Sequence, residues 1–328
     1  MRRALIVGHT GQDGRILWDQ LVRGGFSVVG ISRSGANAHR ATWDELVDIS
    51  DLAAVMRLMA HYKPDRIFYL AAYHHSSQED LGDDTDMWSR SLSVHVEAFR
   101  HFLHCASVIC PRSRIFYASS SRVFGEADGS PQSENTPLRP ECMYGITKAT
   151  AMLLANYYRR VHGVYVSCGI LYNHESPLRG EQFVSRRVID GLVSIACGHS
   201  TFLEVGNLDA RVDWGYAPDY TRAMQLILEA DIPRDFVIAS GRTHSVRELI
   251  GAAASYLGLS WEKYVFETSG ILRRNSQQLC GDSSLLREVT GWTPSIDFNT
   301  MIKILVDASK DRHQGEAIRF PDVDVSLF

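Results

Sequence analysis

A glycine-rich segment directly after the first apolar run constrains the fold of this chain most. The run Ala4–Val7 is followed at once by Gly8-His9-Thr10-Gly11-Gln12-Asp13-Gly14, and a helical pattern comes next. Glycines between a strand and a helix let the backbone approach a pyrophosphate, which the free N–H groups of the helix N-terminus bind. We therefore expect dinucleotide binding by Gly8, Thr10, Gly11, Gln12, Asp13 and Gly14. The spacing differs from the commoner G-x-G-x-x-G, and a glycine-rich turn without a ligand is the alternative.

Short apolar runs alternate with helical patterns through the first half of the chain. Strands are predicted at 4–7, 28–31, 66–70, 114–117 and 165–171, and helices at 15–23, 51–61, up to about 106, and 144–161. Such alternation is typical of βαβ units with right-handed crossovers. The expected fold class is α/β, a doubly wound parallel sheet of the Rossmann type.

The pattern changes near Asn173, after which glycine and proline punctuate the sequence and the helices between them look short. We expect a dinucleotide-binding domain over residues 1–172, to which some later segments return. Residues 173–328 are expected to form a smaller, mixed and interleaved substrate lobe.

The end of the second predicted strand indicates which dinucleotide is bound. A carboxylate there binds the ribose hydroxyls of NAD, whereas an arginine accommodates the extra phosphate of NADP. The strand ends Ile31-Ser32-Arg33-Ser34, without an acid. Arg33 therefore favours NADP, with NAD still possible and a solvated surface arginine as the alternative. Asp48 and Ile49 are expected to flank the adenine.

A tyrosine and a lysine stand one helical turn apart in Tyr144-Gly145-Ile146-Thr147-Lys148. Hydride chemistry at a carbinol needs a group that accepts the hydroxyl proton. Free tyrosine titrates near 10, and a neighbouring ammonium is expected to lower that pKa. Ser119-Ser120-Ser121, after the fourth strand, supplies hydroxyl donors. The pattern Y-x-x-x-K also occurs by chance on packed helices, but its combination with the N-terminal loop argues against chance.

Together these motifs resemble the extended short-chain dehydrogenase/reductase family, and within it the GDP-mannose 4,6-dehydratases. The resemblance covers nearly the whole chain, including Leu70-Ala71-Ala72, Asn173-His174-Glu175-Ser176-Pro177 and Gly206-Asn207-Leu208-Asp209-Ala210. It implies that Tyr144 is the base, Lys148 its partner and Ser120 the hydroxyl that polarises the sugar oxygen. It also implies a GDP-sugar substrate. Cofactor contacts are expected from Leu70, Ala71 and Ala72, and substrate contacts from Asn173, Glu175, Arg179, Val184, Arg187, Asn207 and Arg211.

One departure from the family pattern concerns the reaction itself. The dehydratases carry a glutamate two residues after the catalytic hydroxyl, and Arg122 occupies that place here. A guanidinium is effectively never deprotonated and cannot remove the sugar C5 proton. The expected function is therefore hydride transfer at C4 of a GDP-hexose, by a 4-keto reductase or an epimerase. Two alternatives stay open: a 4,6-dehydratase whose base is Glu126 or Glu175, and an inactive regulator that senses NADP.

Smaller departures concern charge and assembly. The family arginine before Asp213-Trp214 is Val212 here, with Arg211 adjacent, and His95 stands where an asparagine is common. The loop after the second strand is shorter than the tetramer-forming loop of the dehydratases. We expect a homodimer through helices near 93–107 and 145–161.

Composition indicates which partners, cellular compartment and metal sites can be expected for this chain. The net charge is −4, which gives no reason to expect nucleic acid or a membrane as partner. Six scattered cysteines without a C-x-x-C pair, and the lack of a long apolar run, predict a cytoplasmic protein with reduced thiols. His101, His104 and Cys105 share a helical stretch, but without a second ligand pair we expect packing and no metal.

Overall fold

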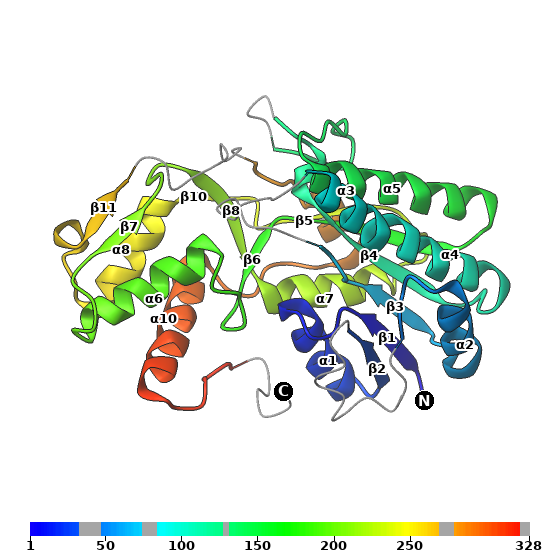
Figure 1. The fold of residues 1–328 in the computed structure, drawn as a ribbon, viewed down its shortest axis with the longest axis horizontal. Coiled ribbons are helices and arrows are strands. Elements are labelled where there is room, and N and C mark those ends of the chain that lie inside the picture. Colours follow the sequence, from blue (N-terminus) through cyan, green and yellow to red (C-terminus); the bar gives the residue numbers. More distant parts are fainter. Residues whose placement is uncertain (33–46, 74–83, 127–130, 269–278, 322–328) are drawn as a thin grey trace.

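The computed structural model describes residues 1–32, 47–73, 84–126, 131–268 and 279–321. A six-stranded, wholly parallel sheet runs through the larger part of the molecule in the order β2-β1-β3-β4-β5-β9 (Figure 1). Its strands are β1 (Arg3–Val7), β2 (Ser27–Ile31), β3 (Arg66–Tyr69), β4 (Arg114–Ser120), β5 (Tyr165–Leu171) and β9 (Phe236–Ile238). The predicted doubly wound parallel sheet is confirmed.

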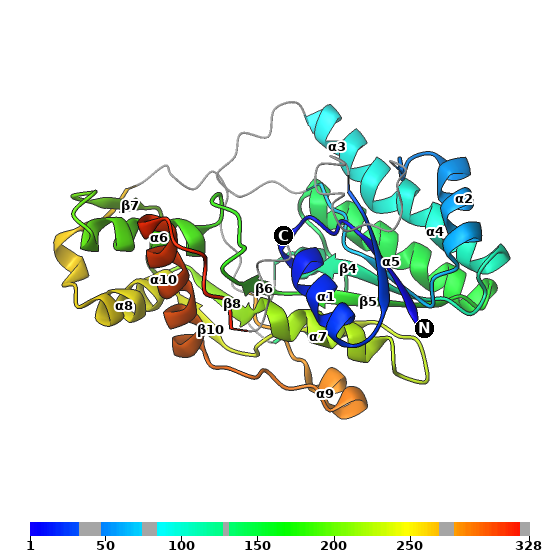
Figure 2. The same cartoon turned by 90° about the horizontal axis from the view of Figure 1, so that it is seen from below.

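Helices cover both faces of this sheet. On one face α1 (Gln12–Arg23) packs against α7 (Ala217–Ile227), and Figure 2 shows these two helices in front of the strands. The other face carries α2 (Leu52–Tyr62), α4 (Ala98–Val108) and α5 (Met143–Val161). The long predicted helix before residue 106 is α3 (Asp84–Leu92), a π-helical turn (Ser93–Glu97) and α4 in succession.

A second, smaller region has its own apolar core. It contains α6 (Val184–Ala196), α8 (Val246–Leu257) and α10 (Phe298–Gln314), the sheet β10-β8-β6 (Thr243–Ser245, Arg211–Tyr216, Asn173–Glu175) and the pair β11-β7 (Val265–Glu267, Leu203–Val205). These helices are 13, 12 and 17 residues long, so the expectation of short helices is wrong. Each is long because it buries an apolar stripe against the other two.

The chain passes between the two regions more than once. α7 and β9 lie between β8 and β10 in sequence, yet they pack in the first sheet, and α9 (Ser284–Thr290) returns to pack on β9. A short helical turn, η3 (Ser121–Val123), follows β4, and η4 (Trp261–Lys263) precedes β11. The domain limits at residues 172 and 173 stay a prediction.

The parallel topology determines where chemistry can occur. The loops after β1, β3, β4 and β5 all leave the sheet at its carboxyl edge, where open α/β sheets bind their ligands. The second region begins at the same edge, because β6 follows β5 after a single residue, Tyr172. Ligand groups held by the sheet and by the second region are therefore brought together.

Candidate active site

The loop after β1 is shaped for close approach of a ligand to the backbone. A Cβ atom on Gly8, whose φ is +96°, would lie 2.8 Å from the backbone nitrogen of Ala71, and one on Gly14 would lie 2.5 Å from the Gly8 carbonyl oxygen. Gly11 is the N-cap residue of α1 and has no side chain to bond the first-turn N–H groups. A Cβ there would have nothing nearer than 3.5 Å. The loop therefore has room for a dinucleotide pyrophosphate, and the binding role of its residues stays a prediction.

A cavity of about 1000 Å³ opens over this loop and runs on to the second region. It brings together most of the predicted site residues: Gly8, Thr10, Gly11, Gln12, Asp13, Gly14, Leu70, Ala72, Ser120, Arg122, Tyr144, Lys148, Asn173, Arg179, Val184, Arg187 and Asn207. A second cavity, of about 830 Å³, lies over β8 and α8 and has His244 and Phe298 in its wall. The predicted chemistry belongs to the first cavity.

Several predicted cofactor contacts are not among the described residues of the cavity wall. Arg33 lies outside the described residues. Asp48 and Ile49 are not among the described residues of the cavity wall; the Asp48 carboxylate accepts hydrogen bonds from Ser50, and the Ile49 carbonyl faces His101. Ala71 contributes backbone that packs against Gly8 rather than a lining side chain.

The reacting centre combines β4 with the first turns of α5. Lys148 is buried, and its Nζ donates a 2.7 Å hydrogen bond to the carbonyl oxygen of Ala118. The same nitrogen lies 5.6 Å from the centre of the Tyr144 ring. Gly145 allows α5 to come this close to η3, since a Cβ there would lie 2.4 Å from the Arg122 carbonyl oxygen. Ser120, Tyr144 and Lys148 are thereby gathered in one wall of the cavity.

The protonation states at this centre differ from the prediction. Burial raises the pKa of Tyr144 above its usual value, and the cations of Arg179 and Arg122 only partly oppose that effect. Burial also lowers the pKa of Lys148 to about 7. The predicted lowering of the Tyr144 pKa is therefore wrong for this structure, because burial raises that pKa more than the cations of Arg179 and Arg122 lower it.

His95 contacts the ring of Tyr144, the predicted proton-transfer residue. The backbone amide of Tyr73 donates to His95 Nε2 at 3.0 Å, so this nitrogen accepts and Nδ1 carries the proton. Nδ1 lies 2.8 Å from the hydroxyl oxygen of Thr147 and thus donates to it, and the His95 ring meets the Tyr144 ring edge-on at 5.2 Å. His95 lies in the π-helical turn, a feature frequent at functional sites, which the sequence pattern did not reveal.

The carboxylates proposed as alternative bases lie in different surroundings. Glu175 is buried; it accepts a 2.5 Å hydrogen bond from Ser185 and pairs with Arg179 at 3.3 Å. It is not among the described residues of the cavity wall. Glu126 is exposed and lines the cavity, as does Arg122, whose backbone nitrogen donates to the Ser120 hydroxyl at 3.3 Å. Of the two glutamates, Glu126 is the one with access to a bound substrate.

Neighbouring residues on β8 face opposite sides of the strand. Val212 lines the cavity, whereas Arg211 bonds the Thr243 carbonyl oxygen at 2.7 Å and pairs with Glu248 at 3.2 Å. The structure therefore places Arg211 away from the cavity that was expected to receive it. The positively charged side chains that the second region does contribute to the cavity wall are Arg179 and Arg187.

Within the described ranges no three His, Cys, Asp or Glu side chains form a group able to hold a metal ion. No helix of those ranges has the length and apolar character needed to cross a membrane.

Known proteins resemble this chain in sequence and in structure. Residues 5–305 match the GDP-mannose 4,6 dehydratase family. GDP-mannose 4,6 dehydratase 1 of Arabidopsis thaliana is 33% identical over 335 residues, covering 96% of this chain and 91% of the plant protein. RMD from Pseudomonas aeruginosa, solved with NADPH, has a TM-score of 0.81 at 20% identity, covering 95% of this chain and 100% of that one. UDP-glucose 4-epimerase from Thermotoga maritima, solved with UDP-glucose, has a TM-score of 0.80 at 20% identity, covering 96% and 100%.

The fold and the cavity define a nicotinamide-dependent, nucleotide-sugar-modifying enzyme of the extended short-chain dehydrogenase/reductase type. Within that class, the chain belongs to the GDP-mannose 4,6-dehydratase family, which confirms the resemblance seen in the sequence.

Proposed function

We propose that this enzyme acts on a GDP-hexose by hydride transfer at C4, as a 4-keto reductase or an epimerase, and that it does not eliminate water. One observation carries the proposal. Arg122 stands in the cavity wall beside Ser120, at the place where the family's dehydratases have their glutamate. A permanent cation there donates hydrogen bonds and steadies negative charge, but it takes no proton from C5.

The protonation state of Tyr144 supports the reductive direction. When bound, the nicotinamide cofactor supplies the hydride. A tyrosine whose pKa is raised by burial is a neutral phenol at pH 7, and it can give its proton to the oxygen of a 4-keto group. Ser120 is available to hold the same oxygen, and Lys148, with its pKa lowered to about 7, can return a proton to the phenolate.

The ligands of the proposed reaction match the charges in the cavity. Arg179 and Arg187 offer planar, charge-assisted donors suited to a diphosphate, with Asn173 nearby in the wall. The first-turn N–H groups of α1 suit the pyrophosphate of a dinucleotide. We propose NADP as that dinucleotide, on the sequence of residues 31–34, and GDP as the sugar carrier, on the family relationship.

Two competing functions are separated by one experiment. The purified protein is incubated with GDP-mannose in one sample, and with a 4-keto GDP-sugar and NADPH in another. The mass of the nucleotide sugar in each sample is then measured by mass spectrometry. We expect the keto sugar to gain two hydrogens and GDP-mannose to keep its water. Loss of one water at roughly 1 per second or faster would instead indicate a dehydratase, with Glu126 as the accessible base. Conversion of a GDP-hexose to its C4 epimer leaves the mass unchanged, so chromatography of the sugars detects it and would indicate the epimerase. No turnover of any GDP-, UDP- or dTDP-sugar by either readout would indicate a regulator.

The role of Arg122 has its own test. Arg122→Glu restores a carboxylate at the dehydratase position, and Arg122→Gln removes the charge without adding a base. We expect a product lighter by one water from the Glu variant alone. Equal behaviour of the two variants toward GDP-mannose would show that this position does not select the reaction.

We also propose that the enzyme is a homodimer formed through α4 and α5. These helices pack side by side, and Val108, Leu153, Tyr157 and Val161 on them are 52–64% exposed. Leu153, Tyr157 and Val161 are four residues apart on α5 and therefore share one face of that helix, and exposed apolar side chains gathered on one face are typical of an interaction surface.

A further inference from the structure

Asp13 introduces a charge problem into the dinucleotide loop. It is the second residue of α1 and lies in the first helical turn, where a carboxylate is favoured by the helix dipole. The same turn is the expected seat of a pyrophosphate, and both groups are negative. The Asp13 side chain is 20% exposed and lines the cavity, so solvent screens this repulsion only partly. A cation close to Asp13 is therefore needed for the loop to bind an anion well.

His174, at the start of the second region, is that cation. Its Nδ1 lies 2.7 Å from the carbonyl oxygen of Tyr172, and its Nε2 lies 2.9 and 3.1 Å from the two carboxylate oxygens of Asp13. A carbonyl and a carboxylate only accept hydrogen bonds, so both ring nitrogens carry protons. Burial opposes the charge, but Asp13 outweighs it and raises the pKa of His174, while the imidazolium holds the pKa of Asp13 below its usual value.

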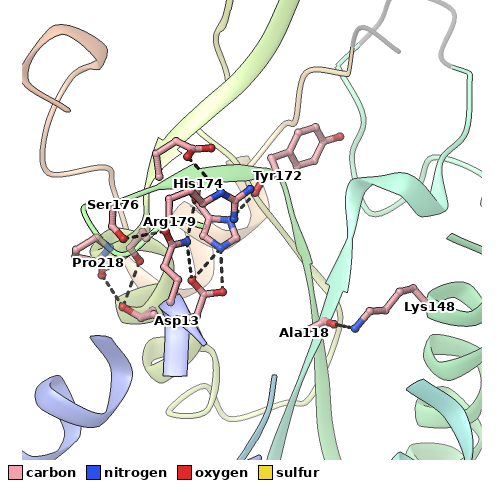
Figure 3. A network of polar contacts seen from close by, with 12 residues as sticks. Asp13, Ala118, Lys148, Tyr172, His174, Ser176, Arg179 and Pro218 are labelled. Carbon is pink, nitrogen blue, oxygen red and sulfur yellow. Dashed lines mark hydrogen bonds and ion pairs between the residues drawn. The ribbon is translucent and has the colours of Figure 1, made fainter. Parts of the chain in front are cut away.

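A second pair of contacts runs alongside the first (Figure 3). Gln12 Nε2 donates to the carbonyl oxygen of His174 at 3.1 Å, and the Ser176 hydroxyl donates to Gln12 Oε1 at 2.8 Å. The Ser176 oxygen also accepts the backbone N–H of Leu178 at 3.1 Å. Two adjacent residues of α1 thus hold the chain just before Arg179, the expected diphosphate ligand.

His174 is fixed on its other side by α7. Its ring stacks on Tyr220, with 4.6 Å between the centroids and 24° between the planes. Tyr220 is itself buried and meets Trp292 edge-on. His174 therefore has one position, from which it holds the dinucleotide loop and the segment 174–179 at a set separation.

We propose that Asp13 and His174, assisted by Gln12 and Ser176, form a clamp that positions the dinucleotide loop against the sugar-nucleotide segment and couples binding at the two sites. The coupling rests on the proposed function, whereas the clamp itself does not need it. Ordering of one segment by its ligand orders the other through these contacts, so each ligand binds more tightly when the other is present. Asp13 and His174 are positioning residues in this role.

The test compares Asp13→Asn, His174→Phe and the double variant with the unaltered protein. Phenylalanine keeps the ring that stacks on Tyr220 and removes both N–H donors. The matched control is His244→Phe, because His244 also stacks on an aromatic ring, Phe298 at 3.8 Å, and also pairs with a carboxylate, Glu248 at 3.0 Å. It lies in the wall of the other cavity.

The first measurement is amide hydrogen exchange without ligands. We expect each clamp variant to exchange faster at both 8–16 and 172–180, the double variant to add little to either single one, and the control to change neither segment. Faster exchange confined to the substituted segment overturns the clamp. If Asp13→Asn and His174→Phe do not fold, Ser176→Ala tests the same expectation through the Gln12 contact.

The second measurement is the Kd of NADPH with and without GDP. We expect GDP to tighten NADPH binding about fivefold or more in the unaltered protein and in the control, and the factor to fall to about one in the clamp variants. An unchanged factor in the variants overturns the coupling. Failure of GDP or NADPH to bind the unaltered protein contradicts the proposed function, and the exchange result then decides on the clamp alone.

Discussion

The side-chain nitrogen of Lys148 lies 5.6 Å from the centre of the Tyr144 ring and donates a hydrogen bond to the carbonyl oxygen of Ala118. One lysine thus ties the first turns of α5 to the end of β4, the strand that carries Ser120. Lys148 is buried and Tyr144 is half-buried, and the loss of solvent around them raises the pKa of the phenol and lowers the pKa of the ammonium to about 7. In the proposed reaction, this arrangement would move a proton to a sugar oxygen without a carboxylate.

Removing the Tyr144 hydroxyl should abolish most of the chemistry. Tyr144→Phe keeps the ring that contacts His95 and removes the proton-transfer atom. We expect the hydride step to slow at least ~100-fold, with little change in substrate binding. Single-turnover oxidation of NADPH measures the step, and Tyr157→Phe, at an exposed position of the same helix, is the control. A Phe variant with near-native rates would assign the proton to another residue.

Lys148 should make the stability of the protein depend on pH. With a folded-state pKa of about 7 and an unfolded value of about 10.4, the unfolded chain binds the extra proton between these values. Stability then rises with pH across that window, and the cost of burying the charged form is greatest below pH 7. We expect the unfolding free energy of the native protein, relative to Lys148→Met, to increase from pH 7 to 10. Urea unfolding measures the difference; a value constant over this range would be evidence against a buried, proton-shedding lysine.

The choice of dinucleotide should depend on Arg33. A bidentate contact of its guanidinium with the 2′-phosphate of NADP is worth on the order of 1.5–3 kcal/mol, or about 10–150-fold in affinity. We expect NADP to bind more tightly than NAD, and we expect Arg33→Ala to reduce this difference in affinity. Fluorescence titration with both dinucleotides tests this, and equal curves for the native protein would refute it.

A charge on the exposed face of α5 should dissociate the proposed dimer. Leu153 is 64% exposed, and Leu153→Asp would bury an unpaired carboxylate in the interface. We expect sedimentation to show a monomer for this variant and a dimer for the native protein. Phe202→Asp is the control, since Phe202 is 54% exposed but lies in the second region. If the native protein sediments as a monomer, the proposed dimer does not exist. If the Leu153→Asp variant sediments as a dimer, the interface lies elsewhere.

Local patterns predicted five of the six strands of the parallel sheet, because the signals for them are local, whereas the short strand β9 was not predicted. Most of the predicted site residues line one cavity. The run at 165–171 is a strand with those bounds, and the glycines at 8–14 lie against a helix N-terminus. Helix α1 begins at Gln12, three residues before the prediction, because the loop itself forms the first turn. The lengths of the helices in the second region were underestimated, because their apolar stripes are buried only where these helices pack against one another.

The sequence by itself determined the parallel α/β fold, and it predicted the dinucleotide loop and the Tyr144–Lys148 pair, since strand–helix alternation and one-turn spacing act over a few residues. Only the tertiary structure decided which neighbours reach the cavity and which charges persist there. It turned Val212 inward and Arg211 outward, because successive strand residues face opposite sides. It raised the pKa of Tyr144, because desolvation depends on everything packed around the phenol. It also joined Asp13 to His174 across 161 residues of sequence, a contact that exists only once the sheet edge brings both segments together.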